Sequence, residues 1–258
     1  MRTIVITGAS SGIGEALALE YASNGIRLAI TGRSKDRLEA VSEACRAKGA
    51  QVLTAVMDVR DRAAMASWLR EVDDQSPVDL VIANAGVIAG TDERGALESG
   101  DAGYELMRIN ILGVANTVQP LLPFMTARGR GQIGIVSSIA AFVPLSHAPS
   151  YSASKAALLN YGKSLRDGLR TRGVRVSVIC PGYVDTRLSR LEVGVKPFLM
   201  SATHAAKRIA NGLQRDREVI IFPAFFGCLT RLSGLLPSWL RRALSEPYRF
   251  KVKDRLPH

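Results

Sequence analysis

The chain has 258 residues, 47% of them hydrophobic and 22% charged, which is within the range of one compact α/β domain. Its three cysteines, Cys45, Cys180 and Cys228, are widely spaced, which argues against a disulfide framework and against a metal site, and favours a cytoplasmic protein. The formal net charge of +11 can attract phosphate-bearing ligands, nucleic acid or anionic membranes, but the sequence shows no zinc finger or RNA-binding strand, so we expect no nucleic-acid partner.

Short runs rich in Val, Ile and Leu alternate along the chain with stretches whose apolar residues have helical spacing. The predicted strands cover residues 3–7, 27–31, 51–57, 78–84, 131–138, 175–181 and 218–222. The predicted helices include residues 13–23, 35–47, 63–72, 155–170 and 201–213. Alternation of this kind predicts parallel βαβ units. We expect residues 1–222 to form one doubly wound, Rossmann-type α/β domain with a seven-stranded parallel sheet flanked by helices, and residues 223–258 to form a C-terminal extension.

The first predicted strand ends in TGASSGIGEALA, a glycine turn directly before a helix. Gly8 allows a tight turn, while Gly12 and Gly14 let the backbone approach a pyrophosphate group at the positive end of the helix. The spacing is G-x-x-x-G-x-G, which differs from the better-known G-x-G-x-x-G fingerprint. A purely structural turn between strand and helix is the alternative.

The second predicted strand ends in AITGRSKDRL, with Arg33 at the tip and no carboxylate before Asp36. An acidic residue at this place usually holds the adenosine ribose of NAD, whereas an arginine can pair with the 2′-phosphate of NADP. We therefore expect NADP(H) to be preferred over NAD(H), with Ser10 adding a hydroxyl contact. The alternative is a solvated arginine at a loop tip.

Tyr151 and Lys155 lie four positions apart in PSYSASKAAL, on one face of a predicted helix. A nearby ammonium stabilises a phenolate and lowers the pKa of the tyrosine, so that proton exchange with an alcohol becomes feasible. Ser138 follows an apolar strand, where a loop could bring its hydroxyl to the same oxygen. By itself this spacing is more typical of an exposed helical turn.

Several short motifs occur together in one order: TGASSGIG, NAG at 84–86, Asn110 in RINILG, Ser138, YSASK at 151–155 and PGYVDT at 181–186. In this order and spacing the chain closely resembles the short-chain dehydrogenase/reductase family over residues 3–222. The resemblance implies that Tyr151 is the acid/base and that Lys155 lowers its pKa and holds the nicotinamide ribose. It implies that Ser138 binds the substrate oxygen and that Asn110 supports a proton relay. The cofactor-binding residues that it implies are Gly8, Ser10, Ser11, Gly12, Ile13, Gly14, Asp58, Val59, Asn84, Ala85, Gly86, Tyr151, Lys155, Pro181, Gly182, Val184 and Thr186.

These patterns together predict an NADPH-dependent oxidoreductase that reversibly reduces a hydrophobic aldehyde or ketone, since the expected lining segments 140–150 and 187–201 are largely apolar. An NAD-dependent alcohol dehydrogenase and a non-catalytic cofactor sensor are the alternatives. His147 either contacts substrate or serves packing.

Residues 224–258 depart from the family, because apolar positions at helical spacing are followed by a basic segment. This pattern favours peripheral contact with an anionic membrane, or packing on the substrate cleft or on a partner subunit. We expect a homo-oligomer, with a dimer through residues 103–125 and 151–170 favoured.

Overall fold

The computed structural model of the chain describes residues 1–92, 94–225, 227, 230, 236, 237, 239, 240 and 250–252. Seven parallel strands form one central sheet in the order β10-β6-β5-β4-β1-β2-β3. Their bounds are β1 Arg2–Thr7, β2 Ile26–Gly32, β3 Gln51–Val56, β4 Val78–Ala83, β5 Gly131–Val136, β6 Val174–Pro181 and β10 Val219–Phe222. The order reverses between β1 and β4, so the predicted doubly wound, single-domain fold is confirmed.

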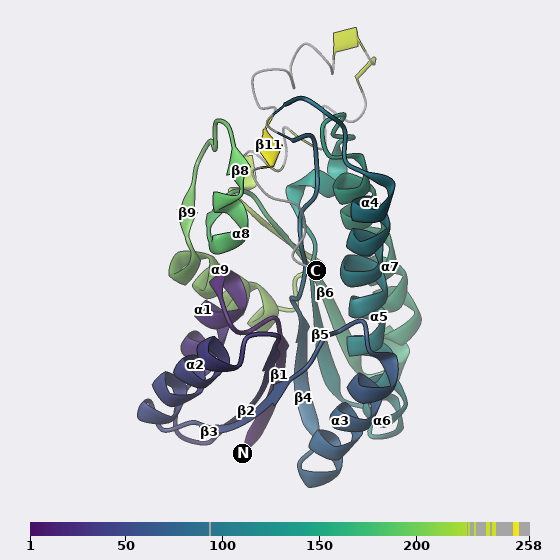
Figure 1. Cartoon of the computed structure of the whole chain (residues 1–258). Coiled ribbons are helices and arrows are strands. Elements are labelled where there is room, and N and C mark those ends of the chain that lie inside the picture. The colour runs from purple at the N-terminus through teal and green to yellow at the C-terminus, as the bar shows by residue number, and fades with distance from the viewer. Residues whose placement is uncertain are drawn as a thin grey trace.

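Helices cover both faces of the sheet (Figure 1). One layer holds α1 (Gly12–Tyr21), α2 (Lys35–Ala47) and α9 (Ala202–Gln214). The other layer holds α3 (Arg62–Gln75), α4 (Gly100–Met107), α5 (Gly113–Val118), α6 (Leu122–Ala127) and α7 (Pro149–Leu169). Because side chains alternate along a strand, Ile4 and Ile6 of β1 belong to the core under the first layer and Val5 to the core under the second.

The connection from α4 to α5 is one turn of π-helix over Arg108–Leu112. This wider turn contains Asn110, whose side chain is fully buried. Short 3₁₀ turns follow at Gln119–Leu121, Ile139–Phe142 and Arg170–Arg172. A π-turn inside a helix often occurs at a functional site, because it redirects a side chain from the regular spacing.

Smaller elements lie beyond the carboxyl ends of the sheet strands (Figure 1). They are β7 (Val184–Asp185) paired with β9 (Met200–Ser201), α8 (Arg187–Arg190), and β8 (Glu192–Val193) paired antiparallel with β11 (Lys251–Val252). The strand predicted over 131–138 ends at Val136, so Ser137 and Ser138 lie on the loop that leaves the sheet. This edge is where a doubly wound sheet binds its ligands.

A partly buried ion pair fastens the end of α6 to α3 and β4. Both guanidinium nitrogens of Arg128 donate to the Asp73 carboxylate at 2.8 Å, and one also donates to the Val78 carbonyl. Asp73 in turn accepts from the Val78 N–H at 2.8 Å. Its side chain is only 6% exposed, so the carboxylate relies on these partners.

Most of the expected amphipathic stripe after residue 223 falls outside the described residues. Of its members, Phe225 is exposed and Trp239 is 71% exposed. Within the described parts of the chain, no helix is both long and apolar enough to cross a membrane.

Candidate active site

The turn between β1 and α1 is built around three glycines that leave no room for side chains. Gly8 and Gly12 have φ of +67° and +61°, in the left-handed region that favours glycine. A Cβ on Gly14 would lie 2.3 Å from the Gly8 carbonyl oxygen and 2.6 Å from Asn84 Nδ2. The sequence therefore folds here into a bare backbone cradle rather than an ordinary turn.

The amino end of α1 is open on the side of this cradle. Ser11 occupies the N-cap position, yet its side chain forms no capping hydrogen bond with the described residues. The first-turn N–H groups of a helix need an acceptor, and they attract anions. A Cβ on Gly12 would lie 3.0 Å from the Thr186 methyl carbon, so the cradle faces the segment after β6. Ile13 turns inward and packs on the core. These features fit a pyrophosphate.

The second end of the site lies where β2 and β3 end. A Cβ on Gly32 would meet Ser10 Oγ at 2.8 Å, so the Ser10 hydroxyl lies against β2. Burial opposes ionisation of Asp58, but hydrogen bonds from Arg60 and the charges of Arg60 and Arg33 outweigh it and lower the pKa of the carboxyl. Arg33 is exposed, and it lies close enough to Asp58 for its positive charge to act on the carboxyl.

Asn84, Ala85 and Gly86 continue directly from β4 and hold the end of that strand to the end of β1. Asn84 Nδ2 donates to the Thr7 carbonyl at 2.9 Å and to the Gly8 carbonyl at 3.2 Å. The N–H groups of Asn84 and Ala85 donate to Thr7 Oγ1. The Asn84 amide is therefore occupied with shaping the glycine turn. The Val59 side chain is likewise committed to the core, where it packs on Gly113.

Tyr151 and Ser138 are brought together by α7 and by the loop after β5. The Ser138 hydroxyl lies close enough to the Tyr151 hydroxyl to affect its pKa. Burial and the charge of Glu192 raise the pKa of the Tyr151 hydroxyl, and the influence of Ser138 offsets only part of that effect. This differs from the expectation that Lys155 lowers the pKa, because desolvation of the phenolate dominates in the protein alone.

Lys155 and Asn110 both approach Gly86, in the loop after β4. Lys155 Nζ is 5.7 Å from the centre of the Tyr151 ring and donates to the Val136 carbonyl at 3.2 Å. A Cβ on Gly86 would lie 3.2 Å from Asn110 Oδ1 and 3.5 Å from Lys155 Nζ. Burial lowers the pKa of the Lys155 ammonium to about 8, opposed by Cys180.

Asn110 is held by three hydrogen bonds. Its Oδ1 accepts from the Val87 N–H at 2.8 Å, and its Nδ2 donates to the Val87 carbonyl at 3.0 Å and to Ser154 Oγ at 3.1 Å. The π-turn over 108–112 aims this amide at α7 and the loop after β4. The structure thus brings the four side chains expected at the reaction centre to one place.

The segment PGYVDT follows β6 along the same edge. The Gly182 N–H donates to the Phe222 carbonyl at 2.8 Å, which ties Pro181 and Gly182 to β10. Val184 is buried in the core, and Thr186 caps α8 by accepting from the Ser189 N–H. Cys180, at the end of β6, is fully buried.

Two polar residues of the site were not foreseen from the sequence. The carboxyl of Glu192 in β8 and the hydroxyl of Tyr183 both lie close enough to affect Tyr151. Burial raises the pKa of Glu192 to about 7, although the positive charge of Lys196 acts to lower it. Burial and Glu192 likewise raise the pKa of Tyr183. Tyr183 lies inside the recognised motif, but Glu192 had no signal beyond being an acid in an apolar segment.

His147 lies under the C-terminal strand rather than free in a loop. It is 8% exposed, and its ring meets that of Phe250 edge to face at 4.4 Å between centroids. Among the described residues, no group of three or more His, Cys, Asp or Glu side chains is placed to hold a metal ion.

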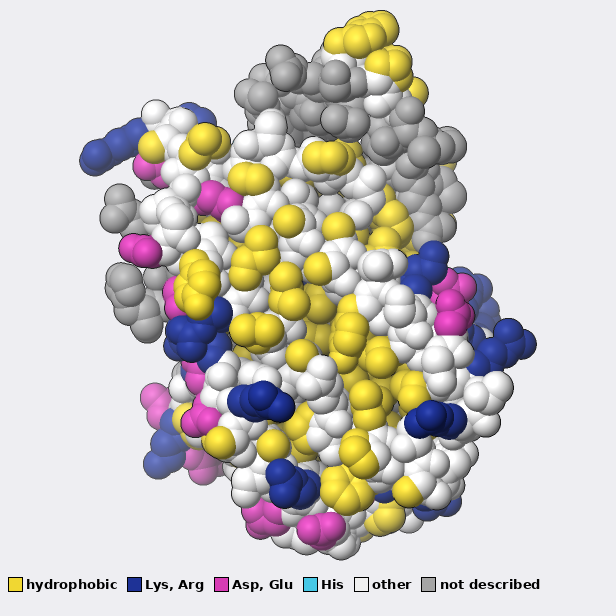
Figure 2. Space-filling view, turned by 90° about the vertical axis from the view of Figure 1, so that its right-hand side faces the viewer, with side chains coloured by type: hydrophobic (Ala, Val, Ile, Leu, Met, Phe, Trp, Pro, Cys, Tyr) yellow, Lys and Arg dark blue, Asp and Glu magenta, His cyan; other side chains and the backbone are white. Residues whose placement is uncertain are grey.

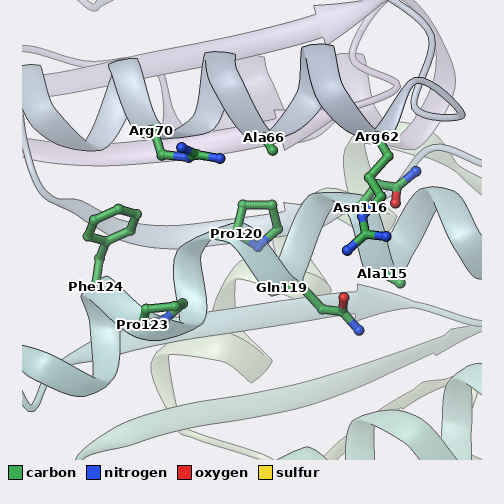
Figure 3. Close-up of a pocket in the computed structure, with 9 residues that line it drawn as sticks. All are labelled: Arg62, Ala66, Arg70, Ala115, Asn116, Gln119, Pro120, Pro123 and Phe124. Carbon is green, nitrogen blue, oxygen red and sulfur yellow. The ribbon is translucent and has the colours of Figure 1, made fainter.

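A separate groove lies between α3 and the α5–α6 segment, away from these residues (Figure 3). Its volume is about 510 Å³. The lining residues are Arg62, Ala66, Arg70, Ala115, Asn116, Gln119, Pro120, Pro123 and Phe124. None of the residues expected to bind cofactor or substrate lines it.

A family model described as short chain dehydrogenase matches residues 2–193. The chain is 37% identical over 242 residues to an "Uncharacterized oxidoreductase" of Myxococcus xanthus (strain DK1622), with 92% of this chain and 93% of the relative covered. It is 31% identical to "11-beta-hydroxysteroid dehydrogenase-like 2" of Arabidopsis thaliana, with 92% and 78% covered.

Solved structures show the same fold. A short-chain dehydrogenase from Sphingobium yanoikuyae in complex with NADPH is 25% identical, with a TM-score of 0.75 and coverage of 92% of this chain and 97% of that one. A short chain dehydrogenase/reductase from Burkholderia phymatum in complex with NAD is 23% identical, with a TM-score of 0.80 and coverage of 100% and 98%. The chain therefore belongs to the short chain dehydrogenase family, as an oxidoreductase that acts on alcohol and carbonyl groups.

Proposed function

We propose that this protein reduces a hydrophobic aldehyde or ketone to an alcohol with NADPH, and that the reaction is reversible. The observation that carries this proposal is the convergence of Ser138, Tyr151, Lys155 and Asn110 at the same sheet edge as the glycine cradle. The neighbouring hydroxyls of Tyr151 and Ser138 supply a proton donor and an oxygen-binding group at one point. A protein that only senses the cofactor would need the glycine cradle but not these four side chains.

In the reductive direction Tyr151 gives its hydroxyl proton to the carbonyl oxygen, and Ser138 donates a hydrogen bond to that oxygen. The raised pKa of Tyr151 keeps the proton in place until the oxygen develops charge. Lys155 is a cation at neutral pH because its pKa, although lowered, stays about 8. Asn110 acts through others, since it positions the backbone of Val87 and the Ser154 hydroxyl beside Lys155.

The residues of the cradle and the adjoining strand ends fit a dinucleotide. The open first turn of α1 and the glycines at 8, 12 and 14 would hold its pyrophosphate. Asp58, the backbone of Val59, and Asn84 to Gly86 would border its adenosine, and Lys155 with the 181–186 segment its nicotinamide end. When bound, the cofactor supplies the electron pair for reduction of the carbonyl carbon.

Preference for NADPH is supported by Arg33. Its guanidinium is exposed at the end of β2, beside Ser10 and within the field of Asp58. An exposed guanidinium can form charge-assisted bonds with a 2′-phosphate, whereas NAD offers it only hydroxyls.

A hydrophobic substrate is supported by the side chains around Tyr151. The tyrosine packs in a cluster that includes Ile88, Ala148, Leu145, Leu188 and Leu191. Apolar walls favour ligands that bury apolar surface, with few polar groups to orient them. The relative from Arabidopsis thaliana carries the name of a hydroxysteroid dehydrogenase, which is consistent with a bulky apolar substrate.

The central test is the Tyr151→Phe variant, which keeps the ring and removes the proton. We expect kcat to fall at least about 100-fold, since general acid catalysis contributes at least that factor, while the Kd for NADPH stays within about twofold. Tyr21→Phe is the matched control, because Tyr21 lies at the end of α1 that is far from the glycine turn, and it should keep the wild-type rate. Near-normal turnover of carbonyl substrates by Tyr151→Phe would refute the proposal.

The cofactor preference is tested by Arg33→Asp, which replaces the cation with a carboxylate. The ratio of kcat/KM for NADPH over NADH should fall at least about tenfold. Arg172→Asp makes the same charge change on an exposed turn before β6 and should leave the ratio unchanged. An equal ratio in Arg33→Asp and Arg172→Asp would mean that another group binds the phosphate.

We further propose a homodimer through α4, α5 and α7. Hydrophobic side chains gather on this face (Figure 2), where Tyr104 is 68% and Leu112 55% exposed. Ala153, Ala156 and Ala157 of α7 are exposed beside them. Large contiguous apolar surface of this kind is typical of an interface. Light scattering should give about twice the chain mass, and Leu112→Asp should give the monomer.

A further inference from the structure

Residues 250–252 return from the end of the chain to the carboxyl edge of the sheet. There β11 pairs with β8, so that Val252 lies opposite Glu192 (Figure 1). On its other side Val252 forms a parallel bridge with Asp92, and its N–H donates to the Thr91 carbonyl at 2.9 Å. The C-terminal strand therefore connects the loop after β4 with the segment after α8.

Phe250 and Val252 point into the molecule, whereas Lys251 between them is exposed. Phe250 and Val252 are each only 5% exposed. They belong to the apolar cluster around Tyr151, whose other members come from the loop after β4, from the segment before α7 and from α8 and its end. The Phe250 ring rests edge to face on His147. Both side chains thus pack in the same apolar cluster as the tyrosine.

Close backbone contacts keep the strand at this depth. A Cβ on Gly90 would lie 2.8 Å from the His147 carbonyl and 3.2 Å from Val252 Cγ2, so no larger residue fits between them. The Thr91 N–H donates to the same His147 carbonyl at 2.7 Å. Gly90, His147 and Val252 are therefore packed against one another, and the strand cannot move inward.

We propose that Phe250 and Val252 form the outer wall of the substrate cleft and limit the size of the carbonyl compound that reaches Tyr151. This inference rests on the proposed function, because it takes Tyr151 to be the point where the carbonyl binds. The segment supplying the wall lies beyond residues 2–193, which the family model matches.

The test uses Val252→Ala and Phe250→Ala, with Val193→Ala as the matched control. Val193 lies on the paired strand but is 39% exposed, so its truncation enlarges no interior space. The kcat/KM for benzophenone is divided by that for propanal under NADPH oxidation. Pocket changes of one or two methyl groups shift such ratios by roughly tenfold. We expect a rise of about tenfold in Val252→Ala, a larger rise in Phe250→Ala, and no change in Val193→Ala.

Further measurements keep the inference falsifiable. Val252→Leu adds a methylene group at the same position, so it should narrow the cleft and lower the ratio. This variant tests the proposal even if a truncated variant fails to fold. Calorimetric Kd values for both carbonyl compounds in the presence of NADP⁺, which cannot reduce them, compare their binding without turnover. If neither the kcat/KM ratio nor the Kd ratio changes in Val252→Ala and Val252→Leu, the proposal that these residues form the wall is wrong. Persistent activity of Tyr151→Phe would instead overturn the proposed function.

Discussion

Glu192 makes the stability of this protein depend on pH in a direction that is unusual for a carboxylate. Burial raises its pKa from an ordinary 4.5 to about 7, so the native state holds a proton that the unfolded chain releases. The stabilisation is fully present below about pH 4.5 and is lost as the pH rises through about 7. The shift corresponds to about 3 kcal/mol of the free energy of unfolding, at 1.36 kcal/mol per pH unit.

The Glu192→Gln variant removes this ionisation and keeps the shape of the side chain. We expect its free energy of unfolding, relative to wild type, to increase by up to about 3 kcal/mol between pH 4.5 and pH 8. Urea unfolding followed by circular dichroism at four or five pH values measures the difference, in which all other titrating groups cancel. Glu39→Gln, on the exposed side of α2, is the control and should show no such trend. A pH-independent difference between wild type and Glu192→Gln would refute the reasoning.

Other changes have equally definite outcomes. The rate of reduction should fall above about pH 8, where Lys155 loses its proton, and a flat profile from pH 7 to pH 10 would contradict the role of its charge. Gly14→Ala places a methyl group 2.3 Å from the Gly8 carbonyl, so it should raise the Kd for NADPH at least about tenfold in a fluorescence titration; wild-type affinity would contradict the cradle. Arg128→Met strands the Asp73 carboxylate and should cost about 3–5 kcal/mol in urea unfolding while leaving kcat unchanged, and a loss under 1 kcal/mol would contradict it.

The central sheet could be predicted because each strand is buried on both faces and so carries an uninterrupted apolar run. The strand predicted over 131–138 was two residues too long, because β5 ends at Val136. Ser137 and Ser138 are as buried as strand residues, although they lie outside the sheet. The glycine turn could also be predicted from the sequence. Gly8, Gly12 and Gly14 are each required by a local constraint, which is either a left-handed backbone angle or a contact below 3 Å that a Cβ would make.

The electrostatics of the reaction centre could not be predicted, because they depend on groups distant in sequence. The i, i+4 spacing of Tyr151 and Lys155 suggested an ammonium that acts directly on the hydroxyl. In the fold, Lys155 Nζ turns to the Val136 carbonyl, while the charge of Glu192 comes from another segment. Nothing in the apolar run around Glu192 marked it as a neighbour of Tyr151, since its position depends on the pairing of β8 with β11.

That pairing connects the two unforeseen features. Glu192 lies opposite Val252 in the small sheet, and Val252 shares the apolar cluster of Tyr151. Burial is the largest cause of the raised pKa of both Glu192 and Tyr151. If Phe250 and Val252 form the proposed wall, size selection and the protonated state of Tyr151 have a shared structural origin, because the side chains that limit the substrate pack in the same cluster as the tyrosine.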